Sequence, residues 1–394
     1  MRNNFNCLKL LALSYALPAF VWGQTNVVTK SLPEIEFNHL NKYLSFELYY
    51  THDYVSNTGG VKQGPRNIGA IDMYLESDLS KYSGIQGDFQ IHYLHIHGND
   101  QRGQIGDLQF ASNIDSPTQI DRMADLWYQQ RWSDQFKTLI GIHDMSMEFN
   151  TTPSSWKFLN ASFGTAADLT YAGPNGPSIY PVTAVGFRAK YELTDYTKVM
   201  AGIYDANPGG EETFRSFHSD IGNTEGYMAI AEIYQKIKKQ KIGFGGWTNE
   251  KKQSRQQKAE DPTPFGFYTM AEKSLSDSLF TFVRYSWATP VANPIQSNAV
   301  TGLMYRGLLQ TRKNLDEVGV GVSQIHIAKK FRDSLKEENE ASYGPKETVY
   351  EFYYQFRPTK IITFRPDFQF IKNPSGAREV DDAMVFALRT VVEI

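Results

Sequence analysis

The feature that most constrains the fold is a two-residue alternation of apolar and polar side chains. In the segment 85–93, Ile85, Phe89 and Ile91 fall on one face, whereas Asp88 and His92 fall on the other. This period is typical of β-strands, whose successive side chains point to opposite faces. The alternation predicts sixteen strands, near 43–52, 68–79, 84–97, 123–132, 136–144, 181–193, 196–205, 225–236, 240–248, 263–273, 278–287, 298–309, 316–327, 347–357, 360–371 and 382–394.

The length of these strands and of their connections favours a membrane. Most are about 9 to 13 residues long, whereas strands in soluble domains average roughly 5 to 6 and a transmembrane strand needs about 9 to 11. Short connections such as 133–135, 194–195, 238–239 and 358–359 alternate with long ones at 98–122, 145–180, 206–224 and 328–346. We therefore expect an all-β transmembrane antiparallel barrel with short periplasmic turns and long extracellular loops. A soluble β-sandwich or propeller would not explain this alternation of short and long connections.

The first residues are typical of an export signal. Arg2 and Lys9 precede an apolar stretch that is too short to cross a bilayer as a helix and ends near Gly23. We predict a signal peptide over 1–23, a periplasmic lead over 24–42 and one barrel over 43–394 in the bacterial outer membrane. Loss of Cys7 with the signal leaves no cysteine, and loss of Arg2 and Lys9 takes the formal net charge from −3 to −5. A mildly acidic chain is a poor candidate for binding nucleic acid.

Strand number suggests that the barrel is a pore. A sheet survives in hydrocarbon only when it is closed, and closure at about 16 strands leaves an aqueous channel. The polar faces of the predicted strands carry charges and amides, among them Arg131, Arg188, Glu232, Glu351, Arg365, Asp367, Gln369 and Arg389. Such groups could bind the hydroxyls of a solute, or they could pair with one another and only line a polar wall; both interpretations remain open.

Several strings in this order and spacing resemble the carbohydrate-selective porins of the OprB type. They are Asp125-Leu126-Trp127-Tyr128, Gly141-Ile142-His143-Asp144, Phe158-Leu159-Asn160-Ala161, Gly186-Phe187-Arg188, Gly202-Ile203-Tyr204-Asp205, Glu351-Phe352-Tyr353-Tyr354, Pro366-Asp367-Phe368-Gln369 and Leu388-Arg389. The resemblance covers about residue 70 to the end. It implies a sixteen-stranded outer-membrane porin that passes monosaccharides or small polyols by facilitated diffusion, without a cofactor. Its partners would be small carbohydrates, the lipid bilayer and the outer-membrane assembly machinery, although Ile394 replaces the usual terminal phenylalanine.

The longest connection, 145–180, is where such a porin would form its constriction. It contains Trp156 and Phe158 with Asn160 nearby. Aromatic faces suit the C–H surface of a sugar ring and amides suit its hydroxyls, but the same aromatic residues could simply pack the loop against the wall. With Asp125, Trp127 and Asp205 from the strings above, these residues complete the predicted pore lining and solute site.

Other functions fit the sequence less well. A barrel-embedded enzyme would need a nucleophile and an oriented base; His143, Asp144 and Ser146 are close in sequence, but neighbouring strand residues point to opposite faces. His95 and His97 share a strand face, whereas His92 points to the other face, so we interpret all three as interfacial or loop residues and predict no metal site. A general or other-solute porin, or an adhesin, remains open.

Overall fold

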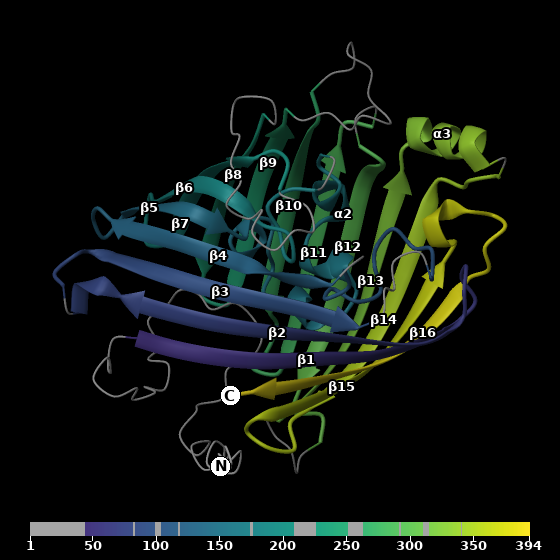
Figure 1. The fold of residues 1–394 in the computed structure, drawn as a ribbon, viewed down its shortest axis with the longest axis horizontal. Coiled ribbons are helices and arrows are strands. Elements are labelled where there is room, and N and C mark those ends of the chain that lie inside the picture. Colours follow the sequence, from purple (N-terminus) through teal and green to yellow (C-terminus); the bar gives the residue numbers. More distant parts are fainter. Residues whose placement is uncertain are drawn as a thin grey trace, which may run out of the picture.

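Sixteen antiparallel strands form one closed barrel in the computed structural model, in which β1 pairs with β16 (Figure 1). The structure describes residues 44–81, 83–98, 104–116, 119–173, 176–208, 226–250, 263–290, 293–309, 315–339 and 341–394. The predicted signal peptide and periplasmic lead lie outside the described residues, so both remain predictions. The sixteen-stranded fold predicted from the alternation is confirmed.

Each strand is hydrogen-bonded to its neighbours in sequence, and the ends of all sixteen lie within six residues of their predicted positions. In chain order they are β1 (Leu44–Thr58), β2 (Gly64–Asp78), β3 (Gly87–Gly98), β4 (Ile120–Arg131), β5 (Phe136–His143), β6 (Ala184–Glu192), β7 (Thr197–Asp205), β8 (Tyr227–Ile237), β9 (Gln240–Asn249), β10 (Phe265–Ser274), β11 (Leu279–Ala288), β12 (Ile295–Arg306), β13 (Asp316–Ile327), β14 (Lys346–Phe356), β15 (Ile362–Lys372) and β16 (Ala383–Glu393).

The two faces of the wall differ as the alternation predicts. On β16, Met384 and Phe386 point outward and are about half exposed, whereas Arg389 points inward and is buried. The apolar outer face suits lipid, and the polar inner face suits a hydrated lumen.

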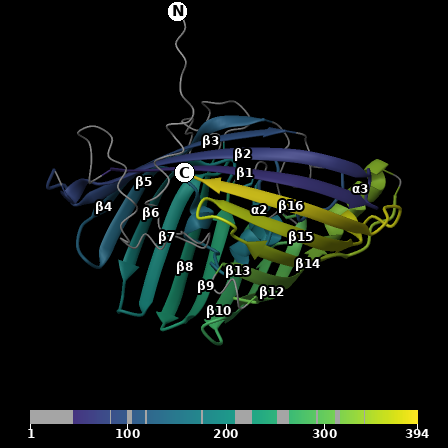
Figure 2. The same cartoon turned by 90° about the horizontal axis from the view of Figure 1, so that it is seen from below.

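The two ends of the barrel differ in the length of their connections. The start of β1 and the C-terminus lie at the end with the short connections, as Figures 1 and 2 show. The opposite end carries the long connections, including α3 (Lys329–Asn339) between β13 and β14. None of the helices among the described residues is both long and apolar enough to cross a membrane.

The first two strands depart most from prediction. β1 continues to Thr58 instead of ending near residue 52, and β2 begins at Gly64 instead of residue 68. The reason is local composition: beyond residue 51 the outward positions of β1 include His52 and Ser56, so apolar alternation fades although the strand continues.

Candidate functional site

Two connections from the long-loop end fold back into the barrel and contact each other there. We call the described residues within 144–183, between β5 and β6, the long inner loop, and the described residues 104–116, between β3 and β4, the second inner loop. The backbone N–H of Asn113 donates to the carbonyl of Leu159 at 2.8 Å, and that of Ala161 donates to Phe110 at 2.9 Å. Figure 2 shows α2 (Ala167–Thr170), part of the long inner loop, inside the ring of strands.

The long inner loop is shaped by four short helices. These are η5 (Met145–Met147), η6 (Ser155–Lys157), α1 (Ala161–Gly164) and α2. The Asp144 side chain accepts from the N–H of Ser146 at the start of η5, and Asn160 does the same for Ser162 at the start of α1. Such caps satisfy N–H groups that a helix start leaves unpaired. The loop therefore has defined structure of its own.

Carboxylates on the inner wall hold this loop by its backbone. Glu232 on β8 accepts from the N–H of Asn150 at 2.8 Å, and Asp125 on β4 accepts from that of Asp144 at 2.8 Å. Glu351 on β14 accepts from the N–H groups of Leu159 and Asn160, the second at 3.0 Å. Hydrogen bonds to charged acceptors are stronger than neutral ones, so these acids fix the beginning and the middle of the loop.

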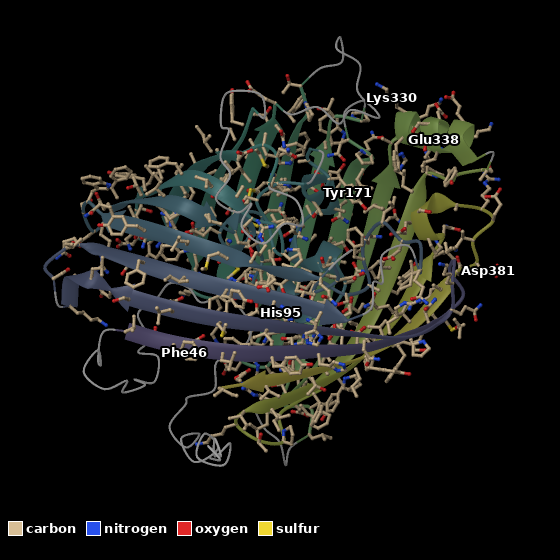
Figure 3. The ribbon with its side chains drawn as sticks, viewed as in Figure 1. Phe46, His95, Tyr171, Lys330, Glu338 and Asp381 are labelled. Atoms are coloured by element: carbon tan, nitrogen blue, oxygen red, sulfur yellow. The ribbon has the colours of Figure 1, made fainter. Side chains whose placement is uncertain are left out.

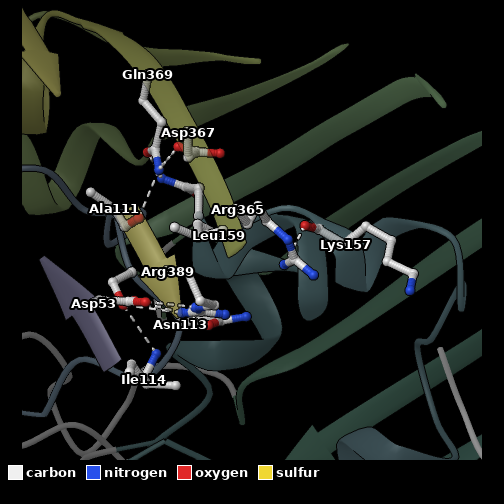
Figure 4. Close-up of polar contacts among 12 residues, drawn as sticks. Asp53, Ala111, Asn113, Ile114, Lys157, Leu159, Arg365, Asp367, Gln369 and Arg389 are labelled. Carbon is white, nitrogen blue, oxygen red and sulfur yellow. Dashed lines mark hydrogen bonds and ion pairs between the residues drawn. The ribbon is translucent and has the colours of Figure 1, made fainter. Parts of the chain in front are cut away.

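Guanidinium groups on the wall bind the loop carbonyls. Arg284 on β11 is almost fully buried and donates to four of them, those of Asn150, Ser162, Phe163 and Gly164, at 2.6–3.1 Å. Arg365 on β15 donates to the carbonyl of Lys157 at 2.7 Å, as Figure 4 shows. An arginine suits this position because its planar fork presents several donors at once.

The second inner loop is also held by hydrogen bonds from wall side chains, near the place where β1 pairs with β16 to close the barrel. Arg389 on β16 makes two hydrogen bonds of 2.7 Å to Asp53 on β1 and one of 2.7 Å to the Asn113 side chain (Figure 4). The Gln369 amide donates to the carbonyl of Ala111 at 2.7 Å. Strands at the point of barrel closure are thereby linked to both the loop and each other.

Aromatic packing completes the attachment of the long inner loop. Phe158 stacks on Phe163 with 4.4 Å between ring centroids and meets Tyr353 edge-on at 5.1 Å. The wall beneath is flat because Gly302 and Gly321 lack side chains: a Cβ at Gly321 would lie 2.6 Å from the Phe163 ring. Phe158 therefore packs the loop against the wall, the alternative left open by the sequence.

Two charged groups of the long inner loop have strongly shifted pKa values. Burial alone would raise the pKa of Glu148, but Arg188 and Lys190 outweigh it and lower this pKa to about 2; Arg188 donates to Glu148 at 2.6 Å. Burial lowers the pKa of Lys157 to about 7. The Lys157 ammonium makes no hydrogen bond to any described residue.

Most of the predicted site residues are buried in this structure. Eleven have at most 4% of their surface exposed: Asp125, Phe158, Asn160, Arg188, Asp205, Glu232, Glu351, Arg365, Asp367, Gln369 and Arg389. Side chains with so little exposed surface are poorly placed for direct contact with a solute in this structure.

The other three predicted residues keep exposed surface. Trp127 and Trp156 are half-buried, and alternation places Trp127 on the inner face with Asp125. Arg131 lies at the short-turn rim, where it pairs with Asp78 and with Asp88 at 3.3 Å. Arg284, the most highly connected support, shares the polar face of its strand with other residues, and nothing in the alternation distinguishes it.

The histidines occupy three different environments. His92 lies buried on the inner wall, 2.8 Å from Asp72 and 3.3 Å from Asp125, so its interpretation as an interfacial or loop residue was wrong. His95 and His97 lie on the outer face. His143 contacts the hydroxyl of Tyr204 at 3.0 Å, while Asp144 caps η5. Among the described residues no group of histidine, cysteine or acidic side chains is arranged to hold a metal ion.

Comparisons with known proteins agree with this architecture. The sequence profile of the carbohydrate-selective porin, OprB family, matches residues 62–393. Porin B of Pseudomonas aeruginosa is 23% identical over 89% of this chain and 87% of its own length, and the putative porin QuiX of Acinetobacter baylyi is 25% identical over 68% of each chain. The high-pH structure of OprB from Pseudomonas putida superposes with a TM-score of 0.80 at 21% identity, covering 89% of this chain and 94% of that one.

Proposed function

Because the chain belongs to the carbohydrate-selective porin, OprB family, we propose that its preferred solutes are monosaccharides or small polyols, which pass through the gap left by the two inner loops. The protein is an outer-membrane porin for small sugars and a channel, not an enzyme.

The observation that carries this proposal is the fixed position of the inner loops. A barrel of about 16 strands is wide enough to leave an open aqueous lumen, but here the long inner loop is bound to β4, β8, β11, β14 and β15. A loop held from several sides narrows the lumen to a gap of defined shape. Such a gap can select solutes by their size and by the side chains that they contact.

We assign the direct contacts with a sugar to groups that remain exposed at this gap. Trp156 in η6 is half-buried and comes directly before Lys157, which is tied to the wall through Arg365. Its ring offers an apolar face for the C–H surface of a sugar. Glu148 and Lys190, which lie 3.6 Å apart and keep part of their side chains exposed, offer an acceptor and a donor for hydroxyls.

The orientation of the barrel supports export and assembly through the usual route. Bacterial barrels have short turns in the periplasm and long loops outside, which places the start of β1 and the C-terminus in the periplasm. We propose cleavage after Gly23 and recognition of β16 by the outer-membrane assembly machinery despite the terminal Ile394. Mass spectrometry of the protein from outer membranes would test the first point: the mature chain should begin at Gln24.

Sugar block of single channels tests the proposed solute class. Open channels in a planar bilayer should be blocked by glucose or a polyol in a concentration-dependent way. Trp156→Ala should weaken the block about threefold to tenfold, from the roughly 0.5–1.5 kcal/mol of an aromatic contact. Trp132→Ala is the matched control, because Trp132 lies in the short β4–β5 turn and is 65% exposed. Channels that no sugar blocks would indicate a general porin or a porin for another solute. Equal sugar block in the Trp156→Ala and Trp132→Ala variants would exclude Trp156 from the solute site.

A further inference from the structure

A cavity lies at the short-turn end of the barrel, beside the turns that join β8 to β9 and β10 to β11. Its volume is about 330 Å³, which is at the lower end of the range for sites that bind small molecules. We call it the lysine pocket, because its lining includes Lys236, Lys238, Lys239 and Lys241. The same lining has two carboxylates, Glu272 and Asp277, so the pocket has an excess of two positive charges.

The strands that form the pocket direct it towards the lumen. Alternation places Lys241 on the inner face of β9, whereas its neighbour Ile242 faces outward and is about half exposed. On β8, Lys236 shares the inner face with the buried Glu232. A ligand of the lysine pocket would therefore come from the water of the channel and not from the bilayer.

The lysine pocket borders the long inner loop on its periplasmic side. The Lys241 ammonium donates to the carbonyl of Thr151 at 2.8 Å, and Glu272 accepts from the N–H of Ser154 at 3.1 Å. A solute that passes the gap beside this loop therefore comes close to the pocket before it enters the periplasm.

The lysines are placed where they repel one another. Lys236 and Lys241 are direct cross-strand partners in the pairing of β8 with β9, and like charges in that position destabilise a sheet. The Glu232 carboxylate lies 3.9 Å from Lys241 and offsets part of this repulsion. Lys239 pairs with Asp277, but both side chains are more than half exposed, and such pairs contribute little. A bound anion would lower the repulsion that remains.

The wall across the mouth from the pocket is acidic. In the closed strand order, β1–β3 lie half-way round the ring from β9–β11. Their inward positions at the short-turn end carry Glu47, Glu76, Asp78 and Asp88. Figure 3 shows Phe46, the neighbour of Glu47, at the opposite end of the barrel from Lys330 and Glu338 of α3. Arg131 neutralises part of this charge, and the remainder directs an anionic group towards the lysines.

We propose that the lysine pocket is a second binding site of the channel, at its periplasmic mouth, for anionic monosaccharides such as sugar acids and sugar phosphates. This inference rests on the proposed sugar function, because the ligand arrives through the same lumen. Ammonium groups bind carboxylate or phosphate as point charges, and Ser274 and Gln240 in the same lining can bind hydroxyls. A neutral sugar gains nothing from the positive charges, so the pocket distinguishes the two kinds of sugar.

Block of single channels by charged and neutral sugars tests this proposal. The complete protein, extracted from outer membranes and placed in a planar bilayer, should be blocked by gluconate and by glucose 6-phosphate at lower concentrations than by glucose. Lys236→Gln/Lys238→Gln should weaken block by both anions about fivefold to tenfold, because each exposed charge contact contributes modestly. Block by glucose should stay as in the wild type. Lys273→Gln/Lys360→Gln is the matched control, since it removes two positive charges at the same end but outside the pocket, and it should leave the anion block unchanged.

Calorimetric titration of gluconate into the detergent-solubilised protein makes the test independent of conductance, and the lysine variant should bind about fivefold to tenfold more weakly. The proposal would be overturned if gluconate and glucose blocked the wild type equally, or if the two double variants behaved alike. Competition by inorganic phosphate as strong as that of the sugar anions would overturn the assignment to sugars. If glucose failed to block while gluconate block depended on the lysines, the lysine pocket would stand and the proposed neutral solutes would be rejected.

Discussion

Replacing Arg284 with methionine tests whether the wall holds the long inner loop in the lumen. Methionine keeps a similar length but removes all four hydrogen bonds to the loop carbonyls. Each hydrogen bond from a charged donor contributes about 1.5–3 kcal/mol. The cost of burying a guanidinium offsets much of the sum, so the net loss should be about 3 kcal/mol.

That loss has a measurable consequence for the channel. About 3 kcal/mol corresponds to a factor of roughly 150 between the inward and displaced positions of the loop. The barrel itself should persist, since the pairing of β11 with β10 and β12 does not involve the Arg284 side chain. Single-channel recordings of Arg284→Met should therefore show frequent excursions to higher conductance and weaker sugar block.

The control for this experiment removes the same charge without touching the loops. Arg131→Met breaks the ion pairs with Asp78 and Asp88 at the short-turn rim, so any effect that comes only from losing a lumen cation appears in both variants. The role assigned to these hydrogen bonds would be refuted if Arg284→Met matched the wild type in conductance, in open-channel noise and in the rate at which proteases cleave the loop.

Three further predictions follow from the same contacts. Gly321→Ala should displace the long inner loop and raise conductance, because its Cβ would meet the Phe163 ring at 2.6 Å. Gly246→Ala, whose Cβ would lie 3.3 Å from the carbonyl oxygen of Gly266, should leave the channel unchanged. Burial lowers the pKa of Lys157 to about 7, so this side chain gains its positive charge as the pH falls from 8 to 6. The anion selectivity of the channel, measured from reversal potentials, should rise over that range, and it should rise less in Lys157→Met. Arg389→Met leaves the buried Asp53 carboxylate without its cation, which should destabilise the barrel by about 3–5 kcal/mol in urea unfolding. Asp53→Leu combined with Arg389→Met should recover part of that loss, and strict additivity of the two changes would contradict the pairing.

The fold could be predicted because one physical constraint acts on every strand. A wall with lipid on one side and water on the other requires alternation, and the segment around Phe352 or Phe386 shows it without interruption. Prediction failed at the outer half of β1, where His52 and Ser56 occupy outward positions.

The site could be predicted only in part, because alternation assigns a face and not a neighbour. It places Glu351 and Arg365 on the inner wall, but their partners, Asn160 and Lys157, lie nearly 200 residues away or more in a loop whose path the pattern does not encode. The residues predicted to meet a sugar therefore include many that meet the loop instead. Trp156 remains a candidate for solute contact because it is half-buried rather than enclosed.

The most direct test of the central claim is the conductance of single channels titrated with sugars, compared between the wild type and Arg284→Met. A channel narrowed by a clamped loop should show steady openings that glucose or a polyol blocks, with the block weakened in the variant. A wild-type channel that conducts ions equally well at every sugar concentration, with the variant indistinguishable from it, would contradict the account.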